Sequence, residues 1–561
     1  MTPSMTLTVV PALLLLLLAA FAPELAAAAS SSRRTIHQPP HFPAGLASLY
    51  RSSGRYAVAD NGTVKPFTAH YFPQELDHFT FTPNSSRVFS QKYLLNDTFW
   101  RRKPTAGPLF VYTGNEGDIE WFTTNTGFMF DIAPEFGALL VFIEKAQPSE
   151  VGDHSPVHPQ KRINSNSYQK LPSGEAFSIN ILKFVRVQHR FYGESQPFGN
   201  DSDKSADTLG YLTSTQALAD FAILITSLKQ NLSAVDAPVI VFGGSYGGML
   251  ASWFRLKYPH VAMGALASSA PILQFDDITP WSGFKDTVTQ DFKSESLNCF
   301  SVIKAVWDVL DDRGSNETGL LELSKTFRTC KTVQSTDSLT NFLYTAFIYT
   351  AMTDYPTPAN FLQNLPAYPV KEMCKIIDSF PAGADVVEKA FAAASLYYNY
   401  TGDQKCFQVE GGDDPHGLSG WDWQACTEMV MPTTVSNESM FPPFNFSYEE
   451  RSERCLASYG VRPRMHWITT EYGGHKIDKV LKRFGSNIIF SNGMRDPWSR
   501  GGVLKNISSS IIALVTEKGA HHLDFRSATK DDPDWVVEQR RQEVEIIHGW
   551  IDQYNKDIAQ M

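Results

Sequence analysis

The sequence of 561 residues predicts an α/β fold in which a serine lies at a sharp turn between a strand and a helix. Residues 238–242 form a short, apolar, β-branched run that indicates a buried strand. Residues 249–258 indicate a helix that ends before Pro259. Between them, Ser245 is the central residue of a G-x-S-x-G pattern. The order of strand, G-x-S-x-G and helix is the nucleophile elbow of α/β-hydrolases, where small residues permit a tight turn that exposes the serine hydroxyl.

A serine becomes a nucleophile only with a base and an orienting carboxylate, and later segments offer both. Residues 487–490 predict a strand whose following loop contains Asp496. Residues 510–515 predict a strand whose following loop contains His521 and His522. A lone aspartate before proline is more often a turn former, and a lone histidine is more often a surface or core residue. Here both follow strands in the order of hydrolases, acid before base, so we predict a catalytic triad. Spacing does not choose between the two histidines.

The mechanism also needs an oxyanion hole. One backbone N–H comes from the residue after the nucleophile, here Tyr246, and the other comes from an earlier strand–helix loop. Residues 108–112 predict that strand. The loop after it contains Asn115, Glu116 and Gly117, which we predict as the second part of the hole. An ordinary turn is the alternative interpretation.

Several long motifs make the chain similar to a known family. They are residues 112–118 (YTGNEGD), 189–195 (HRFYGES), 243–249 (GGSYGGM), 491–498 (SNGMRDPW) and 519–524 (GAHHLD). Together they resemble the serine carboxypeptidase family of prolyl-specific enzymes, whose branches include the Pro-X carboxypeptidases and dipeptidyl peptidase II. The resemblance extends from about residue 71 to the C-terminus. It is closer to the Pro-X carboxypeptidase branch, through residues 424–432, 461–464 and 467–470.

The resemblance implies roles for residues in these motifs. It implies Ser245 as the nucleophile, Asp496 as the orienting acid and His521 as the base. It also implies that His522 and Arg526 lie close to the base and support it.

The resemblance further implies cleavage after proline, which requires an apolar pocket of limited depth. Met249 and Trp498 match positions that form this pocket, and Met431 is a further candidate. Methionine and tryptophan suit a pyrrolidine ring because one is polarizable and the other is flat. Ordinary core packing is the alternative for all three. We expect no cofactor, and no C-x-x-C or H-E-x-x-H spacing suggests a metal site.

The N-terminal region predicts entry into the secretory pathway. Residues 1–29 contain an apolar core and an alanine-rich end, which is typical of a signal peptide, and residues 30–65 are a candidate pro-segment. No later apolar run approaches the roughly 18 to 20 residues that cross a bilayer, so we expect no stable membrane insertion. The expected destination is the lysosome, the vacuole or the extracellular space. N-x-S/T sequons, candidates for glycosylation, lie at Asn61, Asn84, Asn96, Asn200, Asn231, Asn316, Asn399, Asn437, Asn445 and Asn506.

Charge and cysteine content narrow the class of protein. The net charge of −10 and the lack of a basic run argue against nucleic-acid binding. Peptides that contain proline are the expected substrates, and a homodimer is a further hypothesis. The 6 cysteines indicate disulfides in a secretory chain, although their count does not fix the pairing. The family resemblance implies the pairs Cys299–Cys374, Cys330–Cys406 and Cys426–Cys455.

The length exceeds that of a single core, so two domains are expected. Residues 66–275 and 465–561 contain the hydrolase elements. Residues 276–464 contain every cysteine and several helix-like segments. We therefore expect a helical, disulfide-bonded cap domain, inserted into an α/β-hydrolase fold, which admits short peptides and excludes folded proteins.

Residues 145–188 interrupt the resemblance. In relatives, the strand that ends at Glu144 continues directly into the histidine of the HRFYGES motif. The intervening stretch is polar and lacks a sustained period, so we interpret it as a loop or disordered insert. Our hypothesis is that it derives from an unspliced intron or a variant transcript, and the alternative is a tolerated surface loop. Sequencing of the transcripts tests this, because mature messages that uniformly encode the insert would contradict our hypothesis.

The leading functional hypothesis is a serine exopeptidase that removes the C-terminal residue from peptides with penultimate proline. One alternative is the release of N-terminal X-Pro dipeptides, as by dipeptidyl peptidase II. Another is a catalytically silent hydrolase-fold protein, disabled by the insert at residues 145–188 and retained for binding.

Overall fold

The computed structural model describes residues 68–82, 85–102, 105–117, 122–123, 125–144, 189–192, 195–410 and 420–560. The predicted signal peptide, the candidate pro-segment, the insert at residues 145–188, and the sequons at Asn61 and Asn84 lie outside these residues.

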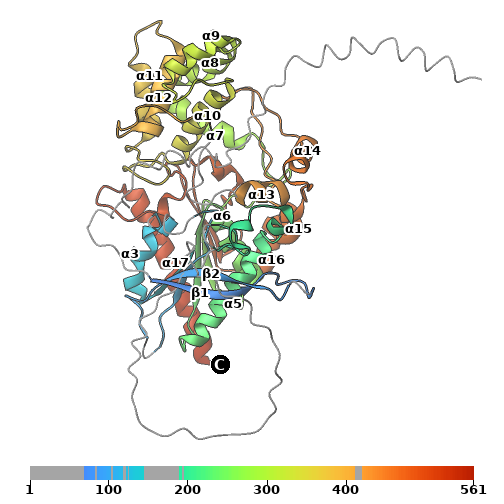
Figure 1. The fold of residues 1–561 in the computed structure, drawn as a ribbon. Helices are drawn as coiled ribbons and strands as arrows, with labels where there is room; N and C mark the ends of the chain where they lie inside the picture. The colour runs from blue at the N-terminus through green and yellow to red at the C-terminus, as the bar shows by residue number, and fades with distance from the viewer. Residues whose placement is uncertain are drawn as a thin grey trace, which may run out of the picture. The chain divides into compact units, whose positions relative to one another are not determined.

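An eight-stranded sheet lies at the centre of the hydrolase elements (Figure 1). Its strands are β1 (Thr68–Glu75), β2 (Val88–Asn96), β3 (Leu109–Tyr112), β4 (Leu139–Glu144), β5 (Val239–Gly244), β6 (Gly264–Ser268), β7 (Ile488–Gly493) and β8 (Ile511–Thr516). Their spatial order is β1-β2-β4-β3-β5-β6-β7-β8. β2 pairs antiparallel with β1 and β4, and every other pairing is parallel. The predicted α/β-hydrolase fold is confirmed.

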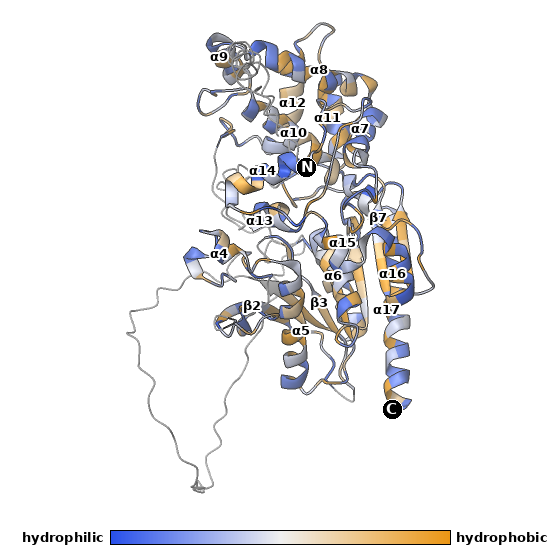
Figure 2. Ribbon diagram, turned by 90° about the vertical axis from the view of Figure 1, so that its right-hand side faces the viewer, coloured by the Kyte–Doolittle hydropathy of each residue, from blue (hydrophilic) through white to orange (hydrophobic). Residues whose placement is uncertain are grey.

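The central strands are apolar along their whole length because helices cover both faces of the sheet. All residues of β3 and of β5 are buried. Alternate residues of β3 contribute to two separate core clusters, with Phe110 in one and Leu109 in the other. Figure 2 shows the strands near β7 in orange, the colour of hydrophobic residues.

Different helices supply the two clusters. The first contains residues of α3 (Gly127–Phe136) and α17 (Asp534–Gln560), and the second contains residues of α5 (Ser214–Asn231) and α6 (Tyr246–Lys257). The shorter helices outside the insertion are η2 (Gly199–Asp201), α4 (Ala206–Leu209), α15 (Trp467–Tyr472), η3 (Gly474–Lys476), α16 (Ile477–Phe484), η4 (Pro497–Gly501) and η5 (Leu523–Phe525). None of the described helices has both the length and the apolarity to cross a membrane.

The chain between β6 and β7 is largely helical (Figure 1). Before α15, its helices are α7 (Gly283–Glu295), α8 (Leu297–Arg313), α9 (Glu317–Thr326), α10 (Asp337–Met352), α11 (Pro369–Asp378), α12 (Val386–Asn399), α13 (Gly420–Thr427) and α14 (Tyr448–Tyr459), and these form the helical insertion. Several begin at a side chain that accepts a hydrogen bond from the N–H three residues later: Ser296, Asn316 and Asp385. The limits of the predicted cap domain, residues 276–464, stay a prediction.

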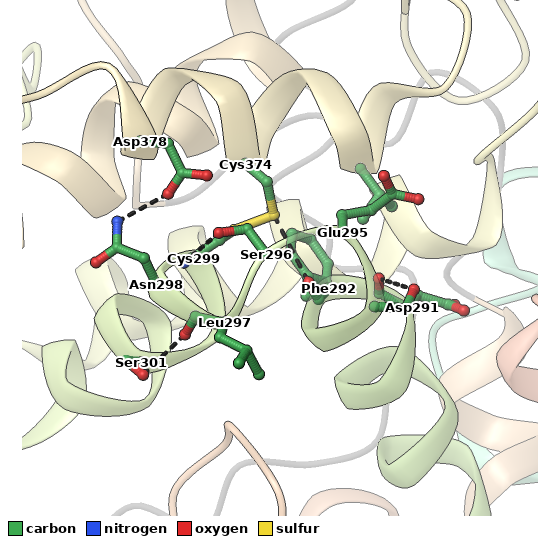
Figure 3. Close-up of a disulfide and its surroundings, with 12 residues drawn as sticks. Asp291, Phe292, Glu295, Ser296, Leu297, Asn298, Cys299, Ser301, Cys374 and Asp378 are labelled. Atoms are coloured by element: carbon green, nitrogen blue, oxygen red, sulfur yellow. Dashed lines mark hydrogen bonds between the residues drawn. A yellow bond between two sulfur atoms is a disulfide. The ribbon is translucent and has the colours of Figure 1, made fainter.

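Three disulfides join parts of this helical region, and they are the pairs that the resemblance implied. Cys299–Cys374 links α8 to α11, as Figure 3 shows. Cys330–Cys406 links the segments after α9 and α12, and Cys426–Cys455 links α13 to α14. Each crosslink holds together elements that are far apart in sequence.

The sequons differ in exposure. Asn200, Asn231, Asn316, Asn437, Asn445 and Asn506 are exposed, and Asn399 is half-buried. Asn96, by contrast, is only 2% exposed, and its Oδ1 accepts a hydrogen bond from the N–H of Thr98 at 2.9 Å. The sequon pattern carries no information on burial, so the burial of Asn96 could not be predicted from it, and glycosylation at each sequon stays a prediction.

We expect Asn96 to carry no glycan when the chain is secreted by a eukaryotic host, because its side chain has no room for one. Enzymatic deglycosylation in heavy-oxygen water, followed by peptide mass spectrometry, distinguishes occupied from empty sequons. Asn231, which is exposed at the end of α5, is the comparison site. A glycan on Asn96 would contradict the observed burial.

Candidate active site

Ser245 occupies a strained turn between β5 and α6. Its backbone has φ 58° and ψ −125°, a conformation that residues other than glycine rarely adopt. The neighbouring glycines are required for it: a Cβ on Gly243 would meet the carbonyl oxygen of Gly247 at 2.0 Å. A Cβ on Gly247 would meet the carbonyl oxygen of Gly114 at 2.4 Å. Ser245 is partly exposed, whereas all of β5 is buried, so the turn brings the hydroxyl out of the core.

Asp496 and His521 meet because they follow neighbouring parallel strands, β7 and β8. His521 Nδ1 donates to Asp496 Oδ2 at 2.9 Å, and both side chains are almost completely buried. The other carboxylate oxygen of Asp496 accepts from the N–H of Trp498 at 3.0 Å, which fixes the orientation of the carboxylate. His521 and Ser245 line the same cavity. Two of the three residues that the family resemblance implied as a triad, Ser245 and His521, thus line one cavity, and the third, Asp496, is bonded to His521.

This cavity is mostly apolar, and the predicted pocket residues Met249, Met431 and Trp498 all line it. The ring of Phe284 on α7 contacts that of Trp498 edge-to-face, with centroids 4.6 Å apart. Sequence reasoning missed six further lining residues: Phe122, Pro271, Tyr349, Met352, Phe361 and Trp421. Four of these lie in the chain between β6 and β7 beyond α7, and no sequence pattern marks them, because only tertiary packing brings them to the serine.

The predicted oxyanion residues differ in their placement. Tyr246 is the first residue of α6, so its N–H has no carbonyl to bond within the helix and lies at the positive end of the helix dipole. Asn115 lines the cavity and is tied to the elbow, since its Nδ2 donates to the carbonyl of Gly244 at 2.8 Å. Glu116 also lines the cavity, whereas Gly117 is buried but is not among the lining residues.

Glu116 is a buried carboxyl beside the proposed base. It is 4% exposed, and burial raises its pKa to about 7. A hydrogen bond from Asn115 Nδ2 at 3.5 Å and the charge of His521 oppose this shift. Glu116 therefore holds a proton over much of the acidic range.

Of the two residues predicted to support the base, His522 lies beside it. The ring centroids of His522 and His521 are 4.4 Å apart, and His522 lines the cavity. Burial, together with the nearby His521 and Arg526, lowers the pKa of His522 well below its usual range, so its ring is neutral. Arg526 does not line the cavity: it donates to Asn125 Oδ1 at 2.5 Å, and its guanidinium lies 5.5 Å from the ring of Tyr355.

A buried polar network behind Tyr246 was not expected from the sequence. The hydroxyl of Tyr246 lies 2.9 Å from His189 Nε2 and accepts from Gln424 Nε2 at 2.9 Å. His189 Nδ1 faces the carbonyl of Arg190 at 2.9 Å, and burial lowers the pKa of His189 to about 4. The neutral ring therefore accepts at Nε2 from the Tyr246 hydroxyl. Both partners belong to motifs that carried the family resemblance, yet nothing in the sequence indicated that these motifs meet.

The network continues to a second buried carboxyl, Glu428. Its Oε1 accepts from Gln424 Nε2 at 3.1 Å and from the N–H of Ser214 at 2.7 Å, and its Oε2 accepts from the Ser214 hydroxyl at 3.1 Å. Burial raises the pKa of Glu428 to about 7, although these hydrogen bonds oppose the shift. Gln424 of α13 thus holds the hydroxyl of Tyr246, and Glu428 holds the amide of Gln424.

Within the described part of the chain, no cluster of histidine, cysteine, aspartate or glutamate side chains is arranged to hold a metal ion.

Comparison with known proteins agrees with the family resemblance of the sequence motifs. The family model described as "Serine carboxypeptidase S28" matches residues 74–148 and 177–543. Lysosomal Pro-X carboxypeptidase of Homo sapiens is 40% identical over 524 residues, which cover 91% of this chain and 95% of that protein. Its counterpart in Bos taurus is 42% identical over 502 residues, covering 88% of this chain and 90% of that protein. The residues between the two matched ranges, 149–176, lie inside the stretch that interrupts the resemblance.

We expect the stability of the chain to fall as the pH rises from about 4.5 to about 7, in part because of Glu428. The folded chain retains the Glu428 proton in this window, whereas the unfolded chain has lost it. Glu428→Gln keeps the shape of the side chain but removes the group that titrates. Between pH 4.5 and pH 7, the free energy of unfolding of this variant should therefore fall less than that of the unmodified chain, by up to about 3 kcal/mol. Urea titrations across this range measure the difference.

Glu449→Gln, at an exposed position on α14, is the control and should retain the slope of the unmodified chain. Equal slopes for both variants and the unmodified chain would exclude a raised pKa at Glu428.

Proposed function

Because the chain belongs to the serine carboxypeptidase S28 family, we propose that it removes the C-terminal residue from peptides whose penultimate residue is proline. Ser245, Asp496 and His521 are the proposed catalytic residues. One observation carries the proposal: the hydrogen-bonded pair of His521 and Asp496 lies at the cavity that also contains the strained Ser245.

In the proposed reaction, Ser245 Oγ attacks the carbonyl carbon of the proline residue. His521 Nε2 takes the hydroxyl proton, while its Nδ1–H stays bonded to Asp496 Oδ2, so one tautomer is held throughout. The resulting oxyanion is bound by the N–H of Tyr246 and by the loop at Asn115–Gly117. His521 then gives the proton to the leaving amine, and water cleaves the acyl-enzyme by the same steps.

The apolar part of the cavity suits the proline ring. Trp498 offers a flat surface, and Met249 and Met431 offer polarizable side chains beside it. A smaller residue in place of proline would bury less apolar surface against these side chains. The resulting preference for proline amounts to about 1–3 kcal/mol.

The proposed compartment is the lysosome or vacuole. Three disulfides fit an oxidising secretory route. Two relatives in Homo sapiens and Bos taurus bear the name lysosomal, and the raised pKa of Glu116 and of Glu428 suits acidic surroundings.

Ser245→Ala should reduce kcat for a blocked Pro-Phe dipeptide by about 10⁵- to 10⁶-fold, because the nucleophile is lost while the pocket is kept. The assay uses purified protein at mildly acidic pH and measures release of phenylalanine. A free X-Pro anilide, offered in parallel, measures dipeptidyl peptidase activity.

Release of phenylalanine alone supports the carboxypeptidase. Cleavage of the anilide alone would replace this proposal with release of X-Pro dipeptides. If neither substrate is cleaved until residues 145–188 are deleted, the form with the insert is a silent one.

Trp498→Ala should lower kcat/KM for blocked Pro-Phe by about 10- to 100-fold and reduce the preference over blocked Ala-Phe. The reason is the loss of the flat surface against the proline ring. Trp535→Ala, a partly buried tryptophan of α17 outside the cavity, is the matched control. An unchanged ratio of the two substrates in Trp498→Ala would exclude this residue from the proline pocket.

A further inference from the structure

Four consecutive residues at the end of α10, Met352–Tyr355, contact the loops of both the proposed base and the proposed acid. They belong to the helical insertion, between β6 and β7. They are part of neither the predicted triad nor the predicted proline pocket. Their contacts connect the helical insertion to the loops after β7 and β8, which contain the proposed acid and the proposed base.

The first contact holds the backbone of His521 on both sides of its Cα. The N–H of His521 donates to the carbonyl of Met352 at 3.0 Å. The carbonyl of His521 accepts from the hydroxyl of Tyr355 at 2.8 Å. Because both polar backbone groups of one residue are bonded to the same segment, the direction in which the imidazole leaves the backbone is restricted.

The second contact holds the loop of Asp496. Arg495, the residue before it, forms an ion pair with Asp354, with 2.8 Å between Nη1 and Oδ2. Asp354 is itself anchored, since its Oδ1 accepts from the N–H of Val370 at the start of α11 at 3.1 Å. The Asp354 side chain is 1% exposed and that of Arg495 is 19% exposed, so water screens this pair far less than a surface pair.

The two catalytic loops are also joined to each other, because the N–H of Arg495 donates to the carbonyl of Gly519 at 3.0 Å. The segment at the end of α10 therefore completes a closed set of bonds through both loops.

We propose that Met352–Tyr355 is a positioning element that sets the geometry between His521 and Asp496. This inference rests on the proposed function. Tyr355 and Asp354 are positioning residues, since they act through the backbone of His521 and through Arg495. The side chain of Met352 lines the cavity, so the same segment shapes the substrate pocket and the triad.

Tyr355→Phe tests the first contact, because it removes one hydroxyl and keeps the ring. We expect kcat for blocked Pro-Phe to fall about fivefold, the factor that corresponds to one net hydrogen bond, with KM unchanged. Tyr398→Phe is the matched control: its hydroxyl donates to the carbonyl of Phe342 at 2.9 Å in the helical insertion, away from the cavity. Similar losses of melting temperature in both variants, with kcat reduced only in Tyr355→Phe, support positioning. Equal kcat in both would overturn it.

Asp354→Asn tests the second contact. Glu295→Gln is the control, because Glu295 on α7 pairs with the same Arg495 at 2.7 Å but does not belong to the segment that holds His521. We expect about a tenfold loss of kcat in Asp354→Asn, as for the loss of a charge-assisted bond, and a change within about twofold in Glu295→Gln. Equal effects would contradict a specific role for the segment.

The rate at which a fluorophosphonate labels Ser245 distinguishes the positioning role of Met352–Tyr355 from the proposed peptidase function. Labelling needs an activated serine but no peptide specificity. If the unmodified chain is labelled quickly and Tyr355→Phe slowly, positioning is supported whatever the peptide preference. If both are labelled equally fast, the positioning role is excluded while the proposed function stands. If the unmodified chain is not labelled at all, the proposed function fails and this inference fails with it.

Discussion

The left-handed backbone of Ser245 is the constraint on which the site depends. It exists because β5 ends against glycines: a Cβ on Gly243 or Gly247 would collide with backbone oxygens. The turn places the serine at the carboxyl end of a buried strand and begins α6 with the N–H of Tyr246 directed away from the helix. Asp496 and His521, the proposed acid and base, reach the same edge because β7 and β8 run parallel to β5 and lie next to each other.

The helical insertion contributes to this site from two sides. On one side, Gln424 of α13 holds the hydroxyl of Tyr246, whose N–H is the proposed oxyanion donor. On the other side, the end of α10 holds the backbone of His521 and the side chain of Arg495. The strands of the sheet therefore bring Ser245, Asp496 and His521 to one edge, and contacts from the insertion restrict the positions of the neighbouring groups.

Several buried carboxyls near the site have raised pKa values. Burial raises the pKa of Glu116 and of Glu428 to about 7. Asp291, whose Oδ1 lies 3.6 Å from Arg495 Nε, has a pKa raised well above its usual range by burial, although the charge of Arg495 opposes this. Protons on these groups neutralise charge that the low-dielectric interior stabilises poorly. Because the folded chain holds these protons more tightly than the unfolded chain, acidic pH favours the folded state.

Local sequence patterns were sufficient to predict the fold class, the strand-to-helix turn at Ser245 and the strands that precede Asp496 and His521, because these depend on short-range arrangements of apolar residues and glycines. Family motifs also indicated the disulfide pairs. No local pattern revealed that Asn96 is buried, that His189 and Gln424 meet at Tyr246, or that Met352 and Tyr355 bond to His521. Those contacts join residues up to 178 positions apart. They follow from the folded structure alone, because a hydrogen bond between distant segments depends on how helices pack, and local sequence carries no record of that packing.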